Sequence, residues 1–320
     1  MRSPAFKGPA DGPVWSNHNE RGSGFWVQIA LWGIRCFRPG CIRVFLPAVA
    51  LYYFLVDRAA RRSSQEYLSR VAEFSGKEQA PRLRDTYAHL YTFAQIILDR
   101  FTLWSGRADT FDVVYHGRRH MQSLLDQGKG AMLIGAHLGN FDVLRLIARE
   151  AKIPVNVLMY VENAQLINEA FQKLDSESMI RVINVSSNSA HMAFQIRECV
   201  KRGEFVAVLS DRVGPNAKKR VSRLEFLGEE APFPESPFSV AMLMELPVIF
   251  TVALKRGPKN YEVFMEEISD GQIDAGISRK EAVLKHMARF VSRLEHYCLS
   301  DPLQWFNFFD FWSGDTNAKE

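Results

Sequence analysis

The chain has 320 residues, of which 47% are apolar, 24% are charged and 12% are aromatic. This balance excludes a disordered or fibrous chain and fits one large α/β domain with appendages, or two small domains. The four cysteines are scattered without a Cys-x-x-Cys pair. Their spacing argues against a disulfide framework or a structural zinc site and favours a reducing compartment.

The formal net charge of +4 is distributed unevenly along the chain. Residues 1–62 carry a net charge of +6, and the remaining residues carry −2. The positive excess adjoins the most apolar stretch, which favours contact with an anionic membrane surface over nucleic acid. A nucleic-acid-binding protein more often spreads its basic residues over a folded face.

Residues 1–24 are rich in Gly, Pro, Ser and Asn and are predicted to be disordered. No signal peptide is visible, because the apolar run starts late and no small-residue cleavage site follows it. Two apolar runs follow, over 25–34 and 44–56, and both are shorter than the roughly 20 residues that a spanning helix needs. We therefore predict an interfacial helical segment over 25–57. The alternative is a pair of helices packed on the core.

The rest of the chain predicts a helical lead-in over 58–105 and an α/β core over 111–312. Within the core, strand-like stretches alternate with stretches of helical periodicity, which indicates a mixed, mostly parallel sheet flanked by helices. The expected strands are 111–115, 131–135, 154–160, 180–185, 205–209, 220–226, 247–254 and 261–266. The expected helices are 58–75, 81–104, 141–150, 190–202, 237–245 and 279–298, the last with a capping box at its start.

One predicted strand–turn–helix junction carries a histidine and an aspartate, in the sequence HLGNFD. His137 follows a buried strand, at the end where open α/β sheets bind their ligands. Asn140 is a predicted N-cap, so Asp142 falls in the first helical turn, where the helix dipole keeps a carboxylate ionised. Asp142 can then accept a hydrogen bond from one imidazole nitrogen and leave the other as a general base. Gly139 would let a substrate approach the backbone.

The spacing of this pair is not specific by itself. His296 and Asp301 repeat the same spacing at the end of a predicted helix, but only His137 sits at a Gly-flanked strand–helix junction. The alternative for His137 is a surface histidine in a loop between a strand and a helix.

Other chemistry-bearing residues have both a functional and a structural interpretation. Asp211 and Arg212 end a predicted strand and should reach the same face as His137, where an arginine suits a phosphate or carboxylate. A structural ion pair is the alternative. His116 and His120 are four residues apart, but no helix is predicted there and a metal site needs more ligands. The motifs of serine hydrolases, P-loop enzymes and nicotinamide-dependent dehydrogenases are absent from the sequence.

HLGNFD after a buried strand resembles the His-x-x-x-x-Asp/Glu motif of the lysophospholipid acyltransferase superfamily. The chain is most similar to the branch of lipid A late acyltransferases and the related acyltransferases of bacterial aryl-polyene-type gene clusters. Three further segments agree in order: GEFVAVLSDR at 203–212, RLEFLGEEAPFPESPFSVAMLMELPVIF at 223–250 and DPLQWFNFFDFW at 301–312. The chain departs from the lipid A enzymes at Arg212, where Gln is usual, and in its Phe-Asp-Phe-Trp tail.

The resemblance implies an acyltransferase domain over 58–320. It would move a fatty or polyene acyl group from an acyl carrier protein or coenzyme A thioester to a hydroxyl of a membrane lipid or glycolipid. His137 would remove the hydroxyl proton, Asp142 would orient the imidazole, and backbone amides near Gly139 and at the start of the helix would hold the oxyanion. No cofactor, metal ion or nucleic acid is implied.

The resemblance also implies substrate contacts and a location. Gly139, Asn140, Asp211 and Arg212 would bind substrate, and residues 226–228, with Phe226 and Gly228, would form a wall of the acyl pocket or pack in the core. The protein would lie on the cytoplasmic face of the bacterial inner membrane, as a peripheral or monotopic protein. The alternatives are a late acyltransferase acting on a lipid A precursor and a non-catalytic membrane lipid-binding protein of the same fold.

Overall fold

The computed structural model of the chain describes residues 42–77, 79–104, 106–159, 179–185, 189–214 and 220–313. The predictions for residues 1–24 and for the apolar run at 25–34 lie outside these ranges.

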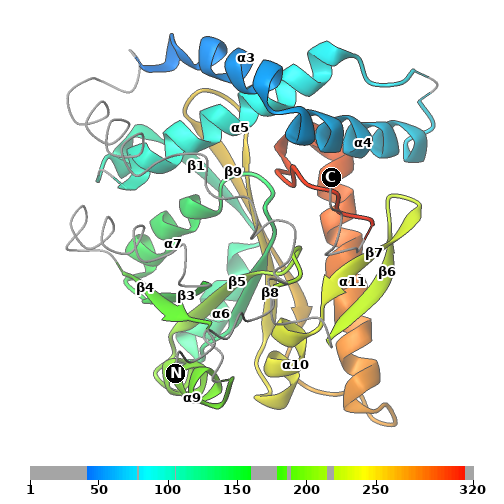
Figure 1. The fold of residues 1–320 in the computed structure, drawn as a ribbon. Helices are drawn as coiled ribbons and strands as arrows, with labels where there is room; N and C mark the ends of the chain where they lie inside the picture. The colour runs from blue at the N-terminus through cyan, green and yellow to red at the C-terminus, as the bar shows by residue number, and fades with distance from the viewer. Residues whose placement is uncertain are drawn as a thin grey trace, which may run out of the picture.

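A seven-stranded mixed sheet forms the centre of the fold (Figure 1), in the order β1-β9-β8-β2-β5-β3-β4. Of its neighbouring strands, β8 and β9 pair antiparallel and the others pair parallel. The strands are β1 (Asp112–His116), β2 (Met132–Gly135), β3 (Val155–Met159), β4 (Ile180–Asn184), β5 (Phe205–Leu209), β8 (Val248–Lys255) and β9 (Asn260–Ser269). The predicted α/β class and mostly parallel sheet are confirmed.

Helices cover both faces of the sheet, which explains why its central strands are continuous apolar runs. All four residues of β2 and seven of the eight residues of β8 are buried. One core cluster joins the sheet to α9 (Ser189–Lys201), α10 (Ser236–Leu243) and α11 (Arg279–Ser300). The other joins the opposite face to α5 (Leu83–Trp104), α6 (Arg118–Asp126) and α7 (Leu144–Ala151).

Helices α3 (Leu46–Val56), α4 (Arg58–Phe74) and α5 gather at one end of the molecule, at the top of Figure 1. Helices α4 and α5 form the predicted lead-in. Helix α3 covers the second apolar run and buries Leu46 and Ala50, while most of its other side chains are exposed. The described part of the predicted interfacial segment therefore packs on α5 with a narrow stripe and leaves an apolar surface uncovered.

Two elements differ from the prediction. Helix α6 forms at the Arg-Arg-His sequence, where no helix was expected; Gly117, with φ +77°, precedes it, and a Cβ there would lie 1.9 Å from the Met265 carbonyl oxygen. Strand β7 (Glu229–Pro234) was also not predicted, because its two prolines and two glutamates are unfavourable in strands. It forms a hairpin with β6 (Val221–Phe226), apart from the main sheet and beside α11 (Figure 1).

Candidate active site

His137 and Asp211 lie at the ends of adjacent parallel strands. Gly135 of β2 stands opposite Leu209 of β5, and each of the two side chains lies two residues beyond its strand. His137 Nδ1 is 2.8 Å from Asp211 Oδ1, and the His137 backbone N–H donates to Asp211 Oδ2 at 2.9 Å. Asp211 is fully buried, whereas the His137 side chain is 29% exposed. The strand register thus gives the imidazole a fixed carboxylate partner.

The surroundings of Asp211 keep it ionised. Its Oδ2 also accepts hydrogen bonds from Trp305 Nε1 and Asn307 Nδ2, both at 3.0 Å. Burial opposes the charged form, but the imidazole, the hydrogen bonds and the nearby Arg212 cation outweigh it and hold the pKa of Asp211 well below its usual range. Since an ionised carboxylate only accepts, Nδ1 carries the imidazole proton and Nε2 carries the lone pair.

The imidazole itself is neutral at neutral pH. Burial lowers the pKa of His137, and the Arg212 and Arg100 cations lower it further against the effect of Asp211. None of the described residues hydrogen-bonds His137 Nε2. The lone pair of Nε2 is therefore available to accept a proton from a molecule in the cavity that His137 lines.

The structure corrects the predicted role of Asp142. Its carboxylate accepts hydrogen bonds from two side chains of α5, Arg100 Nε at 2.5 Å and Trp104 Nε1 at 2.8 Å, while Asp211 takes the position at His137 Nδ1. The predicted cap is confirmed, since Asn140 Oδ1 accepts from the Asp142 backbone N–H at 3.2 Å. Asp142 lines the cavity beside Arg100, in a 3-10 turn (Phe141–Val143) rather than in the first turn of α7.

The turn after His137 is held by its backbone. The Gly139 N–H donates to the Gln304 carbonyl and the Asn140 N–H donates to the Ala253 carbonyl, both at 2.8 Å. Gly139 has φ +66°, and a Cβ there would lie 2.0 Å from the Ala253 oxygen. The Gly139 and Asn140 amides therefore already have acceptors and do not point at the cavity as free donors. Gly139 lines the cavity, whereas Asn140 is fully buried and its Nδ2 contacts the Tyr261 hydroxyl at 3.3 Å.

A cavity of about 690 Å³ opens beside His137. Its polar side chains include Arg100, His137, Asp142 and Arg212, and most of the remaining lining is apolar. The apolar lining comes from the sheet, from α5, α9 and α10, and from the C-terminal segment. It includes Phe93, Ile96, Val157, Leu158, Val182, Met192, Ile196, Val208, Val240, Phe306, Phe308 and Phe309.

Arg212 is held against the cavity wall by the C-terminal segment. Its Nε donates to Asn307 Oδ1 at 2.6 Å, its Nη2 donates to the Phe306 carbonyl at 2.8 Å, and its guanidinium lies 5.4 Å from the Phe309 ring centroid. Burial lowers the pKa of Arg212 to about 10, so it stays charged at neutral pH. Arg212 thus lines the cavity, and its hydrogen bonds go to neutral groups of the C-terminal segment.

Phe226 and Gly228 do not form a wall of this cavity. Phe226 is fully buried and packs against Trp305 and Trp312, at centroid distances of 5.3 and 5.9 Å. A Cβ on Gly228 would contact Phe74 of α4. Phe226 thus follows the core-packing alternative, whereas Gly228 is exposed at the turn between β6 and β7.

Three residues of the site were missed at the sequence level: Arg100, Trp305 and Asn307. Trp305 and Asn307 lie within the C-terminal aromatic block. Only the fold shows that this block lies beside the turn after β2, where Trp305 forms an isolated antiparallel bridge with Leu138. Arg100 belongs to no motif, and the sequence shows only that it lies in a predicted helix.

The alternative histidines lie elsewhere. His296 is exposed on α11, and its spaced partner Asp301 pairs with Arg256. His116 and His120 approach Glu262 and Glu267 at 3.7 and 3.4 Å. No cluster of three metal-binding side chains occurs among the described residues.

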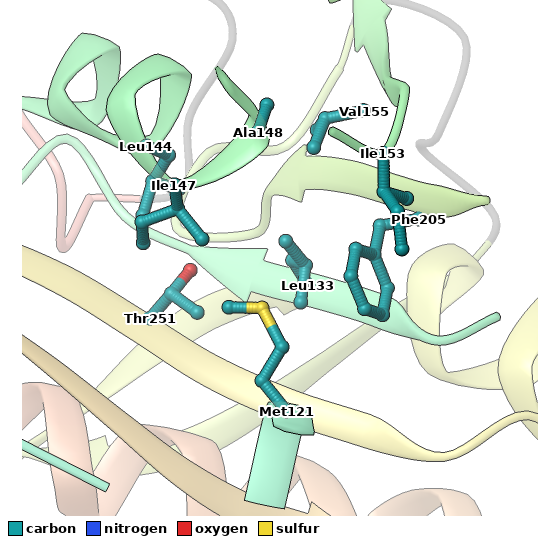
Figure 2. A pocket seen from close by; sticks show the side chains of 9 residues that line it. All are labelled: Met121, Leu133, Leu144, Ile147, Ala148, Ile153, Val155, Phe205 and Thr251. Atoms are coloured by element: carbon teal, nitrogen blue, oxygen red, sulfur yellow. The ribbon is translucent and has the colours of Figure 1, made fainter. Parts of the chain in front are cut away.

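A second hollow lies inside the core and shares Leu144 and Val155 with the lining of the larger cavity. Figure 2 shows nine side chains around it, with the Thr251 hydroxyl as the one oxygen among them. Its volume of about 10 Å³ is near that of a single water molecule, so it cannot receive a substrate.

Comparisons with known proteins give a family and a similar solved structure. The family model for the bacterial lipid A biosynthesis acyltransferase matches residues 16–313. Among solved structures, the chain is similar to the 1-acyl-sn-glycerophosphate (LPA) acyltransferase PlsC from Thermotoga maritima, with 12% identity, a TM-score of 0.35, and coverage of 81% of this chain and 96% of that one. No curated protein sequence matches the chain.

Proposed function

Because the chain belongs to the family of bacterial lipid A biosynthesis acyltransferases, we propose that it transfers an acyl group from a thioester to a hydroxyl of a membrane lipid or glycolipid, with His137 as general base. One observation supports this most directly. His137 is held by Asp211 at Nδ1 and lines an apolar cavity large enough for an acyl chain.

In the proposed reaction, His137 Nε2 takes the proton of the acceptor hydroxyl while the hydroxyl oxygen attacks the thioester carbonyl. Asp211 stabilises the imidazolium that forms, as the carboxylate does in other histidine–carboxylate pairs. The tetrahedral intermediate collapses as the C–S bond breaks, and the imidazolium returns its proton to the departing thiolate. This general-base step contributes typically about 10²–10⁴-fold to the rate.

Two cations flank the proposed base. Arg212 and Arg100 both line the cavity and both lower the pKa of His137. Since the Gly139 and Asn140 amides have other acceptors, we assign stabilisation of the developing oxyanion to these guanidinium groups. Asp142 then acts through Arg100, because it accepts a hydrogen bond from Arg100 Nε and makes none with the imidazole.

The cavity lining supports the proposed type of acyl group. The apolar side chains of the cavity suit a fatty or polyene acyl chain, and acyl carrier protein or coenzyme A would deliver it as a thioester. Thioester chemistry and proton transfer require neither a cofactor nor a metal ion. A lipid A precursor is one acceptor within this proposal.

The proposed location is the cytoplasmic face of the bacterial inner membrane. Across the described ranges, no helix combines the length and apolarity that crossing a bilayer requires. The exposed apolar side chains of α3, beside the basic residues near its two ends, support contact with an anionic membrane surface.

The proposal is tested with purified protein, lauroyl-acyl carrier protein or lauroyl-coenzyme A, and lipids extracted from cells that lack the gene. Mass spectrometry should reveal a lipid heavier by one lauroyl group with wild-type protein and with the His296→Ala control, but not with His137→Ala. The same acylated lipid from His137→Ala would contradict the mechanism. No acylated lipid with either donor, together with binding of lipid by the wild-type protein, would favour a non-catalytic lipid-binding role.

A further inference from the structure

The segment after α11 supplies one side chain that contacts both Asp211 and Arg212. Asn307 is 2% exposed. Its Nδ2 donates to Asp211 Oδ2 at 3.0 Å, and its Oδ1 accepts from Arg212 Nε at 2.6 Å. The two ends of one buried amide thus join an anion and a cation that are neighbours in sequence and that both act on His137.

The hydrogen bonds of Asp211 show what this contact does. Three donors reach Oδ2: the His137 N–H, Trp305 Nε1 and Asn307 Nδ2. The other oxygen, Oδ1, faces His137 Nδ1. Saturation of one oxygen by three donors fixes the carboxylate plane and leaves Oδ1 for the imidazole.

The same amide limits the motion of Arg212. The guanidinium is held at Nε by Asn307 and at Nη2 by the Phe306 carbonyl. Without the Asn307 oxygen, one of these two contacts is lost, and the guanidinium can turn away from Asp211 and His137. Asn307 therefore controls the placement of both charged neighbours of the imidazole.

We propose that Asn307 is a positioning residue, which joins Asp211 to Arg212 and so fixes the carboxylate that orients His137. The catalytic meaning of this arrangement rests on the proposed function, since it treats His137 as the base. Asn307 itself needs no contact with the substrate.

The proposal predicts a change in the acidity of His137. The charged groups that face the imidazole are Asp211 and Arg212 after β5 and Arg100 on α5, and Asp142 lines the same cavity. Asn307→Leu keeps the number and branching of the side-chain heavy atoms but removes a donor from Asp211. The loss of this donor strengthens the hydrogen bond that Asp211 accepts from an imidazolium. It also releases the Arg212 cation. Both changes favour the protonated imidazole, so the pKa of His137 should rise.

The test measures this pKa without any acyl substrate. Full-length wild-type, Asn307→Leu and Asn156→Leu proteins react with diethyl pyrocarbonate from pH 5 to pH 8, and mass spectrometry follows modification of the peptide that contains His137. Asn156 is a matched control, because it is 2% exposed and its Nδ2 donates to the Glu204 carboxylate at 2.9 Å.

The midpoint for His137 should move upward by about one pH unit in Asn307→Leu and stay in place in Asn156→Leu. If the acyl-transfer assay is active, kcat of Asn307→Leu should fall about 10²-fold, the size of loss expected from a misplaced catalytic group. If folded Asn307→Leu protein shows the same His137 midpoint as the wild type, the inference is overturned.

Two further outcomes distinguish the positioning role from a folding defect and from failure of the proposed function. If Asn307→Leu does not fold, Asn307→Ser, which keeps a small polar group, should show a smaller upward shift, and an unchanged midpoint there would also overturn the inference. If Asn307→Leu shifts the midpoint but the wild-type protein transfers no acyl group, the positioning role is supported and the proposed function is contradicted.

Discussion

The two aspartates near His137 make different contacts, so they should respond differently to amidation. Asp211→Asn replaces the acceptor at Nδ1 by a group that can donate, which favours the wrong imidazole tautomer and should lower kcat about 10³–10⁴-fold. Asp142→Asn keeps one oxygen for Arg100 or Trp104 and should cost about tenfold or less, as expected for a residue that acts through a neighbour. Steady-state rates of lauroyl transfer give both values. If kcat falls more in Asp142→Asn than in Asp211→Asn, Asp142 and not Asp211 orients the imidazole.

The sequence predicted the place of His137 at a strand end but not the carboxylate that contacts its Nδ1, and the physical reason is strand order. His137 and Asp211 each lie two residues beyond a strand whose end was predicted correctly, at Gly135 and Leu209. That β2 and β5 are neighbours depends on contacts between segments about 70 residues apart, which local periodicity does not encode. The nearer carboxylate, Asp142, was therefore favoured. Asn307 was missed for the same reason.

A single hydroxyl in the core offers a test of packing close to the site. Thr251 Oγ1 is buried beside the small hollow of Figure 2, and no described group hydrogen-bonds to it. Thr251→Val replaces the hydroxyl by a methyl group and should raise the free energy of unfolding by about 1 kcal/mol, because a buried polar group without a partner carries a desolvation cost. Urea unfolding of the two proteins measures the difference. Destabilisation by the substitution would indicate that a bound water satisfies the hydroxyl.

At the scale of elements, one buried histidine ties the lead-in helices to the C-terminal segment. His89 of α5 is 1% exposed; its Nδ1 lies 2.9 Å from the Ser64 hydroxyl on α4, and its Nε2 lies 2.8 Å from the Trp305 carbonyl. Because the carbonyl only accepts, Nε2 carries the proton and Nδ1 accepts from Ser64. Trp305 in turn contacts Asp211, so this link supports the frame of the site.

Burial lowers the pKa of His89 to about 4 from 6.5, which makes the fold sensitive to acid. The folded protein holds His89 in its neutral form, so the contribution of His89 to the free energy of unfolding is complete above pH 6.5. This contribution is lost as the pH falls from 6.5 towards 4, by about 3 kcal/mol in all. His89→Gln can keep both hydrogen bonds but cannot protonate. Its loss of unfolding free energy between pH 7 and pH 4.5 should be about 2 kcal/mol smaller than that of the wild type.

Urea titrations at the two pH values make this comparison, with the exposed His296→Gln as the control. The same acid sensitivity in His89→Gln and in the wild type would assign the effect to other buried groups.

Elements with a strong local signal were predicted well, and elements formed by context were not. Strand β5 has the expected bounds, and α11 begins at the predicted capping box of Ser278 and Glu281. Strand β7 exists because β6 pairs with it, against its proline content. Helix α6 exists because Gly117 turns the chain against β9 and Met121 reaches the core. In both cases tertiary contacts outweigh local preference.

At the scale of the whole molecule, the apolar surface of α3 remains without a partner among the described residues. The helix packs on α5 through Leu46 and Ala50, whereas Tyr52, Leu55 and Val56 are 60%, 62% and 54% exposed. Deletion of residues 1–56 would remove this surface but would also uncover α5. Substitution of the exposed side chains is therefore the sharper test of membrane contact.

The variant Tyr52→Ser/Leu55→Ser/Val56→Ser should lose most of its binding to anionic vesicles in a flotation assay. Each half-exposed side chain contributes about 1 kcal/mol when it enters the interface, so three losses lower the partition coefficient about 10²-fold. High salt should weaken wild-type binding without abolishing it. Basic residues contribute about 1 kcal/mol each near an anionic leaflet and are screened, whereas apolar contacts are not.

The matched control removes three equally exposed apolar side chains elsewhere, in Val114→Ser/Phe194→Ser/Leu243→Ser, where exposure is 54%, 61% and 58%. These residues lie on β1, α9 and α10, away from α3. The control should float as the wild type does with vesicles of phosphatidylglycerol and phosphatidylethanolamine. Equal flotation of all three proteins would contradict docking through α3 and place the membrane contact outside this helix. Failure of the wild type to float would make α3 a packing element of the protein instead, because its Leu46–Ala50 stripe already joins it to α5.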